Sequence, residues 1–135
     1  MSDDKTTRIW RRYKAGEAPA GAHLATLDDL FLTTVPTIGV NVDGKPEVWA
    51  LAQVIEHAHT RTIYSVSWSS SNMLATCGAD DAIVVYAADA QGNFQVACKR
   101  DKAHGSDVNC VAWSPADAGL LASAGDDTFV KLWHL

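Results

Sequence analysis

Two sets of four polar residues combine the side-chain types that form hydrogen-bond relays. Each set has a histidine, then a hydroxyl residue, an aspartate and an aromatic residue, at closely similar spacings. The sets are His59, Thr76, Asp80 and Tyr86, and His104, Ser123, Asp127 and Trp133. Aspartate accepts hydrogen bonds, histidine and hydroxyl groups can donate and accept, and an indole N–H only donates. The sets therefore predict two buried hydrogen-bond networks.

A histidine, a serine and an aspartate could instead form the catalytic triad of a hydrolase. However, the sequence lacks the glycine-flanked nucleophile elbow of such enzymes, and the set occurs twice. Repetition is typical of a structural device, because a buried polar group without its partner costs about 1–3 kcal/mol. We therefore expect no catalytic residue. Tyr86 departs from the pattern, since a phenol does not occupy the place of an indole N–H. The sequence therefore leaves open whether Tyr86 forms the fourth hydrogen-bond link of the first set.

The segments around the two sets form a sequence repeat. The matching segments are 59–68 with 104–113, 73–80 with 120–127, and 2–10 with 125–133. The corresponding aspartates Asp80 and Asp127 are 47 residues apart. WD repeats, which build one four-stranded propeller blade each, have a period of roughly 40–45 residues. The chain is thus predicted to begin in the middle of such a repeat.

Alternating apolar positions and β-branched side chains predict that the repeats consist of strands. The expected strands are 63–68 and 108–113 (innermost), 73–77 and 120–124 (second), 82–86 and 129–133 (third), and 48–55 and 94–99 (outer). The predicted fold class is all-β: a WD40 β-propeller fragment of about two and a half blades.

The first repeat interval is longer than the second. Asp4 and Asp80 are 76 residues apart, which indicates an insertion of about 29 residues. The glycines and prolines of residues 14–46 are typical of loops, and a short helix is expected at 23–33. The predicted segments are 1–13 (last strands of a partial blade), 14–46 (insertion), 47–92 (WD repeat) and 93–135 (last WD repeat, without its closing strand).

Composition disfavours several classes of protein. The net charge is −5, and the 11 basic residues are scattered apart from a short cluster at 8–14, so no nucleic-acid-binding face is expected. The longest uncharged stretch has 13 residues, whereas a membrane-spanning helix needs about 20. The acidic N-terminus is not a signal peptide. We expect an intracellular protein that binds neither nucleic acid nor membrane.

Three cysteines, Cys77, Cys98 and Cys110, fit neither a disulfide framework nor a C-x-x-C metal knuckle. Cys110 aligns with Ser65 and Cys77 with Ala124, so both fill small strand positions. Ligation of a metal or an iron–sulfur cluster by these thiols is the less favoured alternative. We expect no metal and no cofactor.

Four runs of residues can be compared with known families: Asp3 to Tyr13, His59 to Tyr64, Cys77 to Ile83, and Ala103 to Trp113. Two shorter runs within them, Arg-Thr-Ile-Tyr at 61–64 and Asp-Val-Asn-Cys-Val-Ala-Trp at 107–113, are more particular than the general WD pattern. In these runs the chain resembles the WD-repeat proteins of cytosolic iron–sulfur protein assembly, over residues 2–13 and about 47–135. The insertion stays unmatched.

That resemblance implies that the chain is part of a seven-bladed propeller, which serves as an adaptor of the CIA targeting complex and helps to deliver iron–sulfur clusters to cytosolic and nuclear apoproteins. The implied partners are the other subunits of the complex and the apo iron–sulfur proteins, and the implied location is cytoplasmic and also nuclear. The alternative is a WD scaffold subunit of a signalling or chromatin complex. Fold alone indicates only that a protein partner is bound.

Loops carry the binding residues of propellers, whereas strands form the scaffold. We expect a partner-binding loop surface at Thr60, Arg61 and Asp107, on the same face as the network histidines, with Arg61 as the preferred contact.

Trp68 and Trp113 are expected to pack between blades, while Trp49 begins an outer strand, where exposure is easier. Terminal blades leave strand edges and apolar faces uncovered. The isolated chain is therefore predicted to self-associate or to be unstable.

Overall fold

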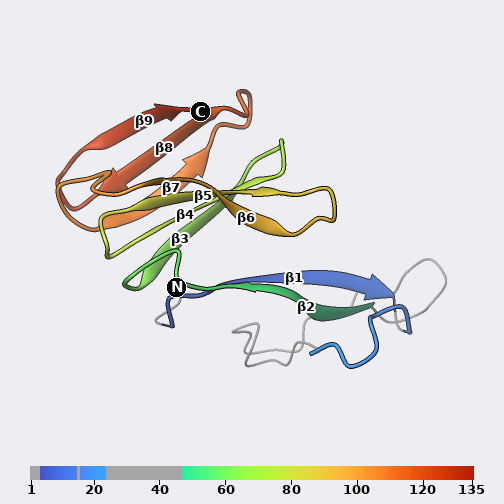
Figure 1. Cartoon of the computed structure of the whole chain (residues 1–135). Helices are drawn as coiled ribbons and strands as arrows, with labels where there is room; N and C mark the ends of the chain where they lie inside the picture. Colours follow the sequence, from blue (N-terminus) through green and yellow to red (C-terminus); the bar gives the residue numbers. More distant parts are fainter. Residues whose placement is uncertain (1–3, 15, 24–46) are drawn as a thin grey trace. The chain divides into compact units, whose positions relative to one another are not determined.

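The computed structural model describes residues 4–14, 16–23 and 47–135. In these ranges the chain forms nine β-strands and no helix, and thus no helix that could span a membrane (Figure 1). The strands are β1 (Thr7–Lys14), β2 (Glu47–Ile55), β3 (Ile63–Trp68), β4 (Met73–Gly78), β5 (Ile83–Ala88), β6 (Phe94–Arg100), β7 (Val108–Trp113), β8 (Leu120–Gly125) and β9 (Val130–His134). The predicted all-β fold is confirmed.

The described strands form three sheets, each built from strands that follow one another in the chain. β1 pairs with β2, β3 to β6 form an antiparallel four-stranded sheet, and β7 to β9 form an antiparallel three-stranded sheet. The two larger sheets belong to one compact unit, which comprises Met1–Thr7 and Ile55–Leu135, and Arg8–Val54 make up the other. The first of these units contains both hydrogen-bond networks.

Strand ends differ from the prediction by one or two residues. β5 continues to Ala88, because its pairing with β6 extends to the pair Ala88 and Phe94. β9 begins at Val130 instead of residue 129. The helix predicted at 23–33 lies outside the described residues except for His23, which is not helical.

Turns recur at equivalent places in the repeats. Lys5, Asp81 and Thr128, with φ of 62, 59 and 68°, each directly follow the aspartate of a repeat. His57 and Lys102, with φ of 62 and 51°, each stand two residues before a network histidine. Such left-handed conformations cost roughly 1–2 kcal/mol per non-glycine residue. Their recurrence shows that the repeats share one backbone path where the sequences differ.

Each sheet has two distinct faces, because residues paired across antiparallel strands point to the same side. The side that carries the hydroxyl and aromatic members of the network is called the relay face. The opposite side is called the reverse face. The relay faces comprise Val66, Trp68, Leu74, Thr76, Val84 and Tyr86 in the four-stranded sheet and Val111, Trp113, Leu121, Ser123, Lys131 and Trp133 in the three-stranded sheet. The reverse faces comprise Ser65, Ser67, Ala75, Cys77, Ile83 and Val85, and Cys110, Ala112, Ala122, Ala124, Val130 and Leu132.

The core of this unit lies between the two sheets, where β7 runs beside β3 and β4 (Figure 1). Its buried side chains include Ala75, Cys77, Ile83 and Val85 from one sheet and Val111, Trp113 and Leu121 from the other. The relay face of the three-stranded sheet therefore packs on the reverse face of the four-stranded sheet. At this boundary the backbone N–H of Trp113 donates to Ser67 Oγ at 3.0 Å.

The two equivalent tryptophans differ in burial. Trp113 packs between the sheets as predicted, with 8% of its surface exposed, but Trp68 is 53% exposed, so the prediction that it packs between blades is wrong. The reason is that the four-stranded sheet covers Trp113, whereas in the described part of this unit no further sheet covers Trp68. Its ring contacts Phe94 edge-on, and its indole N–H donates to Asn72 Oδ1 at 3.0 Å.

Candidate functional site

The network of the three-stranded sheet links four side chains in series. Trp133 Nε1–H donates to Ser123 Oγ at 2.8 Å, and that oxygen lies 2.7 Å from His104 Nε2. His104 Nδ1 lies 2.7 Å from Asp127 Oδ1. Because an indole only donates and a carboxylate only accepts, the Ser123 hydroxyl donates to Nε2 and Nδ1 carries the imidazole proton. A neutral His104 thus satisfies every group of the relay.

The four-stranded sheet holds a relay of the same order. Tyr86 Oη lies 3.2 Å from Thr76 Oγ1, which lies 2.8 Å from His59 Nε2, and His59 Nδ1 lies 2.9 Å from Asp80 Oδ1. The fourth link that the sequence left open is therefore present. Tyr86 is fully buried, and its hydroxyl can donate or accept, so only the carboxylate end of this relay fixes its direction.

Each network aspartate also holds the loop that follows its histidine. The second carboxylate oxygen accepts the Gly105 N–H at Asp127 and the Thr60 N–H at Asp80, both at 2.9 Å. The Gly105 N–H and the bond from His104 hold the pKa of Asp127 well below its usual value. Burial alone would raise the pKa of Asp80, but the bonds from His59 and Thr60 lower it. Both aspartates therefore stay ionised at neutral pH.

Gly125 leaves room for the imidazole of the second relay. A Cβ atom at this position would lie 2.7 Å from His104 Nδ1 and 2.8 Å from His104 Cγ. Gly78 holds the equivalent position in the four-stranded sheet, where a Cβ would overlap the carbonyl oxygen of Thr62. Neither glycine was predicted as a site residue, although each stands two residues after the hydroxyl residue of its relay.

The distances among Ser123, His104 and Asp127 are also those of a hydrolase triad. However, Ser123 is only 2% exposed, and its oxygen already accepts the indole N–H of Trp133. A serine placed in this way cannot approach a substrate carbonyl from solvent. The geometry therefore serves to tie the loops to the strands.

A cluster of loop side chains joins the two sheets on the face of the histidines. Arg61 Nη1 donates to the carbonyl of Ala79 and lies 3.6 Å from Asp107 Oδ1. Tyr64, which sits in a β-bulge of β3 and was not singled out from the sequence, donates from its hydroxyl to Asp107 Oδ2 at 3.0 Å. This bond to Asp107 raises the pKa of Tyr64. Thr60, next to Arg61, is exposed.

The structure thus brings the three predicted contact residues, Thr60, Arg61 and Asp107, to one place. The side chain of Arg61 is 63% exposed, and that of Asp107 is 25% exposed. Arg61 contacts the Ala79 carbonyl and Asp107, while more than half of its side-chain surface stays exposed. Such an arginine is oriented in advance to pair with a carboxylate or a carbonyl of a partner.

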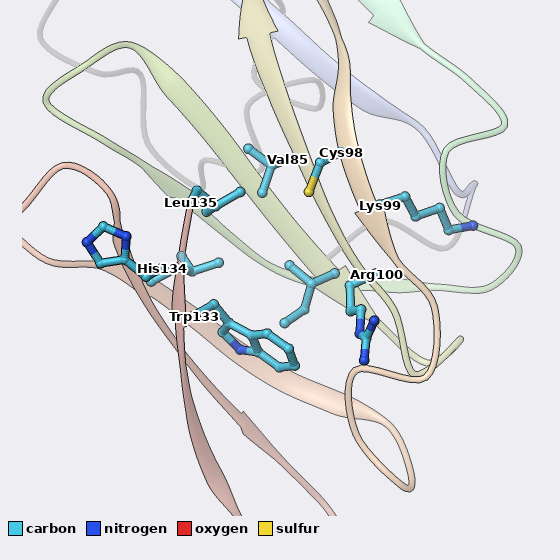
Figure 2. A pocket seen from close by; sticks show the side chains of 9 residues that line it. Val85, Cys98, Lys99, Arg100, Trp133, His134 and Leu135 are labelled. Atoms are coloured by element: carbon cyan, nitrogen blue, oxygen red, sulfur yellow. The ribbon is translucent and has the colours of Figure 1, made fainter.

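A second candidate surface is a mainly apolar cleft between β5 and β6 on one side and β9 with the chain end on the other (Figure 2). It has a volume of about 250 Å³. The lining residues are Ile83, Val85, Cys98, Lys99, Arg100, Leu121, Trp133, His134 and Leu135. In Figure 2 the side chains of Lys99 and His134 point away from the cleft, on opposite sides. Cys98, Val85 and Trp133 give it an apolar character.

The described cysteines show contrasting environments. Cys77 is buried in the core, and burial raises the pKa of its thiol to about 12, whereas Cys98 and Cys110 are exposed. Cys110 Sγ lies 3.9 Å from Ser65 Oγ. Among the residues that the structure describes, no three His, Cys, Asp or Glu side chains are grouped as metal ligands.

Antiparallel sheets that repeat the same relay, with the relay face of one packed on the reverse face of the next, define blades of a β-propeller. The family model for the WD domain, G-beta repeat, matches residues 48–86 and 96–134. These matches cover more than half of the chain, which therefore belongs to the WD-repeat family.

Relatives of the chain include proteins named for one process, cytosolic iron–sulfur protein assembly. The chain is 41% identical over 102 residues to the probable cytosolic iron-sulfur protein assembly protein CIAO1 homolog of Nematostella vectensis, which covers 71% of this chain and 31% of that protein. It is 42% identical over 102 residues to the CIAO1 protein of Rattus norvegicus, with 71% and 30% covered. The chain therefore spans about a third of the length of these relatives, and the resemblance predicted from the sequence is confirmed.

A longer alignment reaches almost the whole chain. The CIAO1 homolog of Chlamydomonas reinhardtii is 33% identical over 145 residues, which cover 99% of this chain and 37% of that protein. This alignment extends across residues 14–46, which were predicted to have no counterpart in the family.

Proposed function

We propose that the chain is a non-catalytic WD-repeat scaffold that binds other proteins in cytosolic iron–sulfur protein assembly. Its partners in this proposal are subunits of the CIA targeting complex and apo iron–sulfur proteins, which it meets in the cytosol and the nucleus. The names of the relatives support a role in this process, and the WD repeats support the scaffold role. The clusters themselves are cargo of the partners.

The observation that carries the proposal is the anchored, exposed arginine of the loop cluster. Two loops from different sheets, 46 residues apart in sequence at Arg61 and Asp107, meet through this ion pair. Exposed ion pairs contribute little to stability, about 0–1 kcal/mol, so stability alone gives little reason for this arrangement. Arginine is enriched among the residues that dominate protein interfaces. The cluster therefore fits a surface that recognises a protein partner.

Affinity capture from cell extract with the tagged 135-residue chain tests this function. Arg61→Glu reverses the charge of the loop cluster, and Arg100→Glu makes the same change at the cleft, which provides a matched control. We expect the unchanged chain and the Arg100→Glu variant to retain iron–sulfur assembly proteins, and Arg61→Glu to retain at least tenfold less, as measured by quantitative mass spectrometry.

Each outcome decides a part of the proposal. Capture of signalling or chromatin proteins without iron–sulfur assembly factors would overturn the assigned process in favour of another scaffold complex. Equal capture by Arg61→Glu and the unchanged chain would show that the loop cluster is not part of the binding surface. Loss of capture with Arg100→Glu alone would show that the binding surface lies at the cleft.

A further inference from the structure

The carboxylate of Asp107 is divided between Tyr64 and Arg61. Its Oδ2 accepts the hydroxyl of Tyr64 at 3.0 Å, and its Oδ1 lies 3.6 Å from Arg61 Nη1. The first distance is that of a hydrogen bond, whereas a guanidinium and a carboxylate that are hydrogen-bonded to each other lie about 2.7–2.9 Å apart. Asp107 is therefore bonded to the phenol and stops short of a direct bond to the arginine.

The bond from Tyr64 fixes the direction of this carboxylate. The backbone of Asp107 is held separately, because its carbonyl accepts the N–H of Asp126 at 3.0 Å, so only the side chain is left to turn. Since the hydrogen bond to Asp107 raises the pKa of Tyr64, the phenol stays protonated at neutral pH and remains a donor. A carboxylate held at Oδ2 cannot turn both oxygens toward the guanidinium, which is the arrangement in which the two groups pair most strongly.

Arg61 consequently keeps most of its hydrogen-bonding capacity. A guanidinium carries several N–H donors in a planar fork. Among the described residues, Arg61 donates one hydrogen bond, to the carbonyl of Ala79, and its side chain is 63% exposed. Its remaining N–H groups are not used within the compact unit to which it belongs.

This arrangement does not recur in the next repeat. Ser106 and Asn109 stand there at the positions of Arg61 and Tyr64, and Asn109 donates to Asp126 of its own sheet. Both sheets form the same strands and relays with either set of residues, so the blade itself does not require an arginine and a tyrosine here. Residues that the common scaffold does not need, in the loops above it, are candidates for a role in binding.

We infer that Tyr64 is a positioning residue: its hydroxyl keeps Asp107 from pairing directly with Arg61, so that the guanidinium stays available to a carboxylate or a carbonyl of a partner protein. Tyr64 acts through Asp107 and does not itself contact the partner. The inference rests on the proposed function only for the choice of Arg61 as the partner contact.

The rate at which phenylglyoxal modifies Arg61 tests this inference, because pairing with a carboxylate slows the reaction of a guanidinium with this reagent. Peptide mass spectrometry of the 135-residue chain measures the rate, and the exposed Arg100 is the internal reference. Tyr64→Phe removes the hydroxyl and keeps the ring. It should slow the modification of Arg61 about three- to fivefold, since exposed ion pairs shift an equilibrium by up to about fivefold.

The double variant Tyr64→Phe with Asp107→Ala is the matched control. It removes the carboxylate as well and should restore the rate of the unchanged chain, while Arg100 reacts equally in all three proteins. An equal or faster reaction of Arg61 in Tyr64→Phe would overturn the inference, because Tyr64 would then support the contact of Asp107 with Arg61 or leave it unaffected. A rate that stays slow in the double variant would also overturn it.

The proposed function is judged separately, by affinity capture with Tyr64→Phe. We expect capture of iron–sulfur assembly proteins to fall together with the reactivity of Arg61. If the reactivity falls and capture does not, the positioning role of Tyr64 stands, and the choice of Arg61 as the partner contact is wrong.

Discussion

The four-stranded and three-stranded sheets are two versions of one blade, and they differ in what covers them. Both contain a buried histidine bonded to a hydroxyl and an aspartate at nearly equal distances. Yet β4 and β5 are buried on both sides, whereas β9 is open on its reverse face. The comparison shows that the relay is set within a blade, while the burial of apolar side chains is set by the neighbouring blade.

The largest contrast is expected between the equivalent tryptophans. Trp113→Ala removes a buried ring from the core and should lower the free energy of unfolding by about 3–5 kcal/mol. Trp68→Ala removes a half-exposed ring and should cost about 1 kcal/mol or less. Urea unfolding monitored by circular dichroism measures both. Equal losses would show that Trp68 is covered in solution.

The next largest effect concerns the histidines. His104→Ala and His59→Ala each remove a buried ring together with its bonds to a hydroxyl and to a carboxylate, which should cost about 2–4 kcal/mol in either case. Similar losses for the two variants would support equal relays in the two sheets. A loss below about 1 kcal/mol for one of them, in the same urea experiment, would break the equivalence.

Substitutions at the aromatic ends of the relays should cost less stability than those at the histidines. Trp133→Phe removes the indole N–H that donates to Ser123, and Tyr86→Phe removes the hydroxyl that contacts Thr76, so each should cost about 1–2 kcal/mol. In both variants the ring keeps much of its packing. Thermal unfolding compares them, and a stabilised Tyr86→Phe would mean that the 3.2 Å contact contributes nothing.

The smallest effect is a dependence on pH. Because the pKa of Asp127 in the folded chain lies below its ordinary value of 3.8, the unfolded chain binds more protons in acid. The resulting stability is present above about pH 4 and is lost as the pH falls further toward the folded pKa. Asp127→Asn should flatten this decline, whereas Asp117→Asn, an exposed control, should not. Urea midpoints between pH 7 and pH 3 measure the slopes.

Much of this architecture is encoded locally and could be predicted from the sequence. The spacing from His104 to Ser123 and Asp127 indicated the second relay, because these residue types have few other ways to satisfy one another when buried. The exposure of Trp68 could not be predicted in this way. Its position in the repeat is that of Trp113, but within their compact unit a neighbouring sheet covers only Trp113.

The loop cluster was predicted only in part. Thr60, Arg61 and Asp107 were expected on one face from their position after the histidines, and the structure places them together. The bond from Tyr64 to Asp107 comes from a residue in a β-bulge of β3, and no residue pattern around this strand predicts the bulge. Because a bulge redirects side chains, the contact of Tyr64 could be recognised only in the structure.

Nitrogen-15 NMR of the imidazole rings at neutral pH tests the two relays most directly. The shifts and couplings distinguish a protonated from an unprotonated ring nitrogen, and the exposed His57 and His134 provide internal references. We predict that His59 and His104 are both neutral with the proton on Nδ1, facing Asp80 and Asp127. A proton on Nε2 of either buried ring would contradict the proposed direction of its relay.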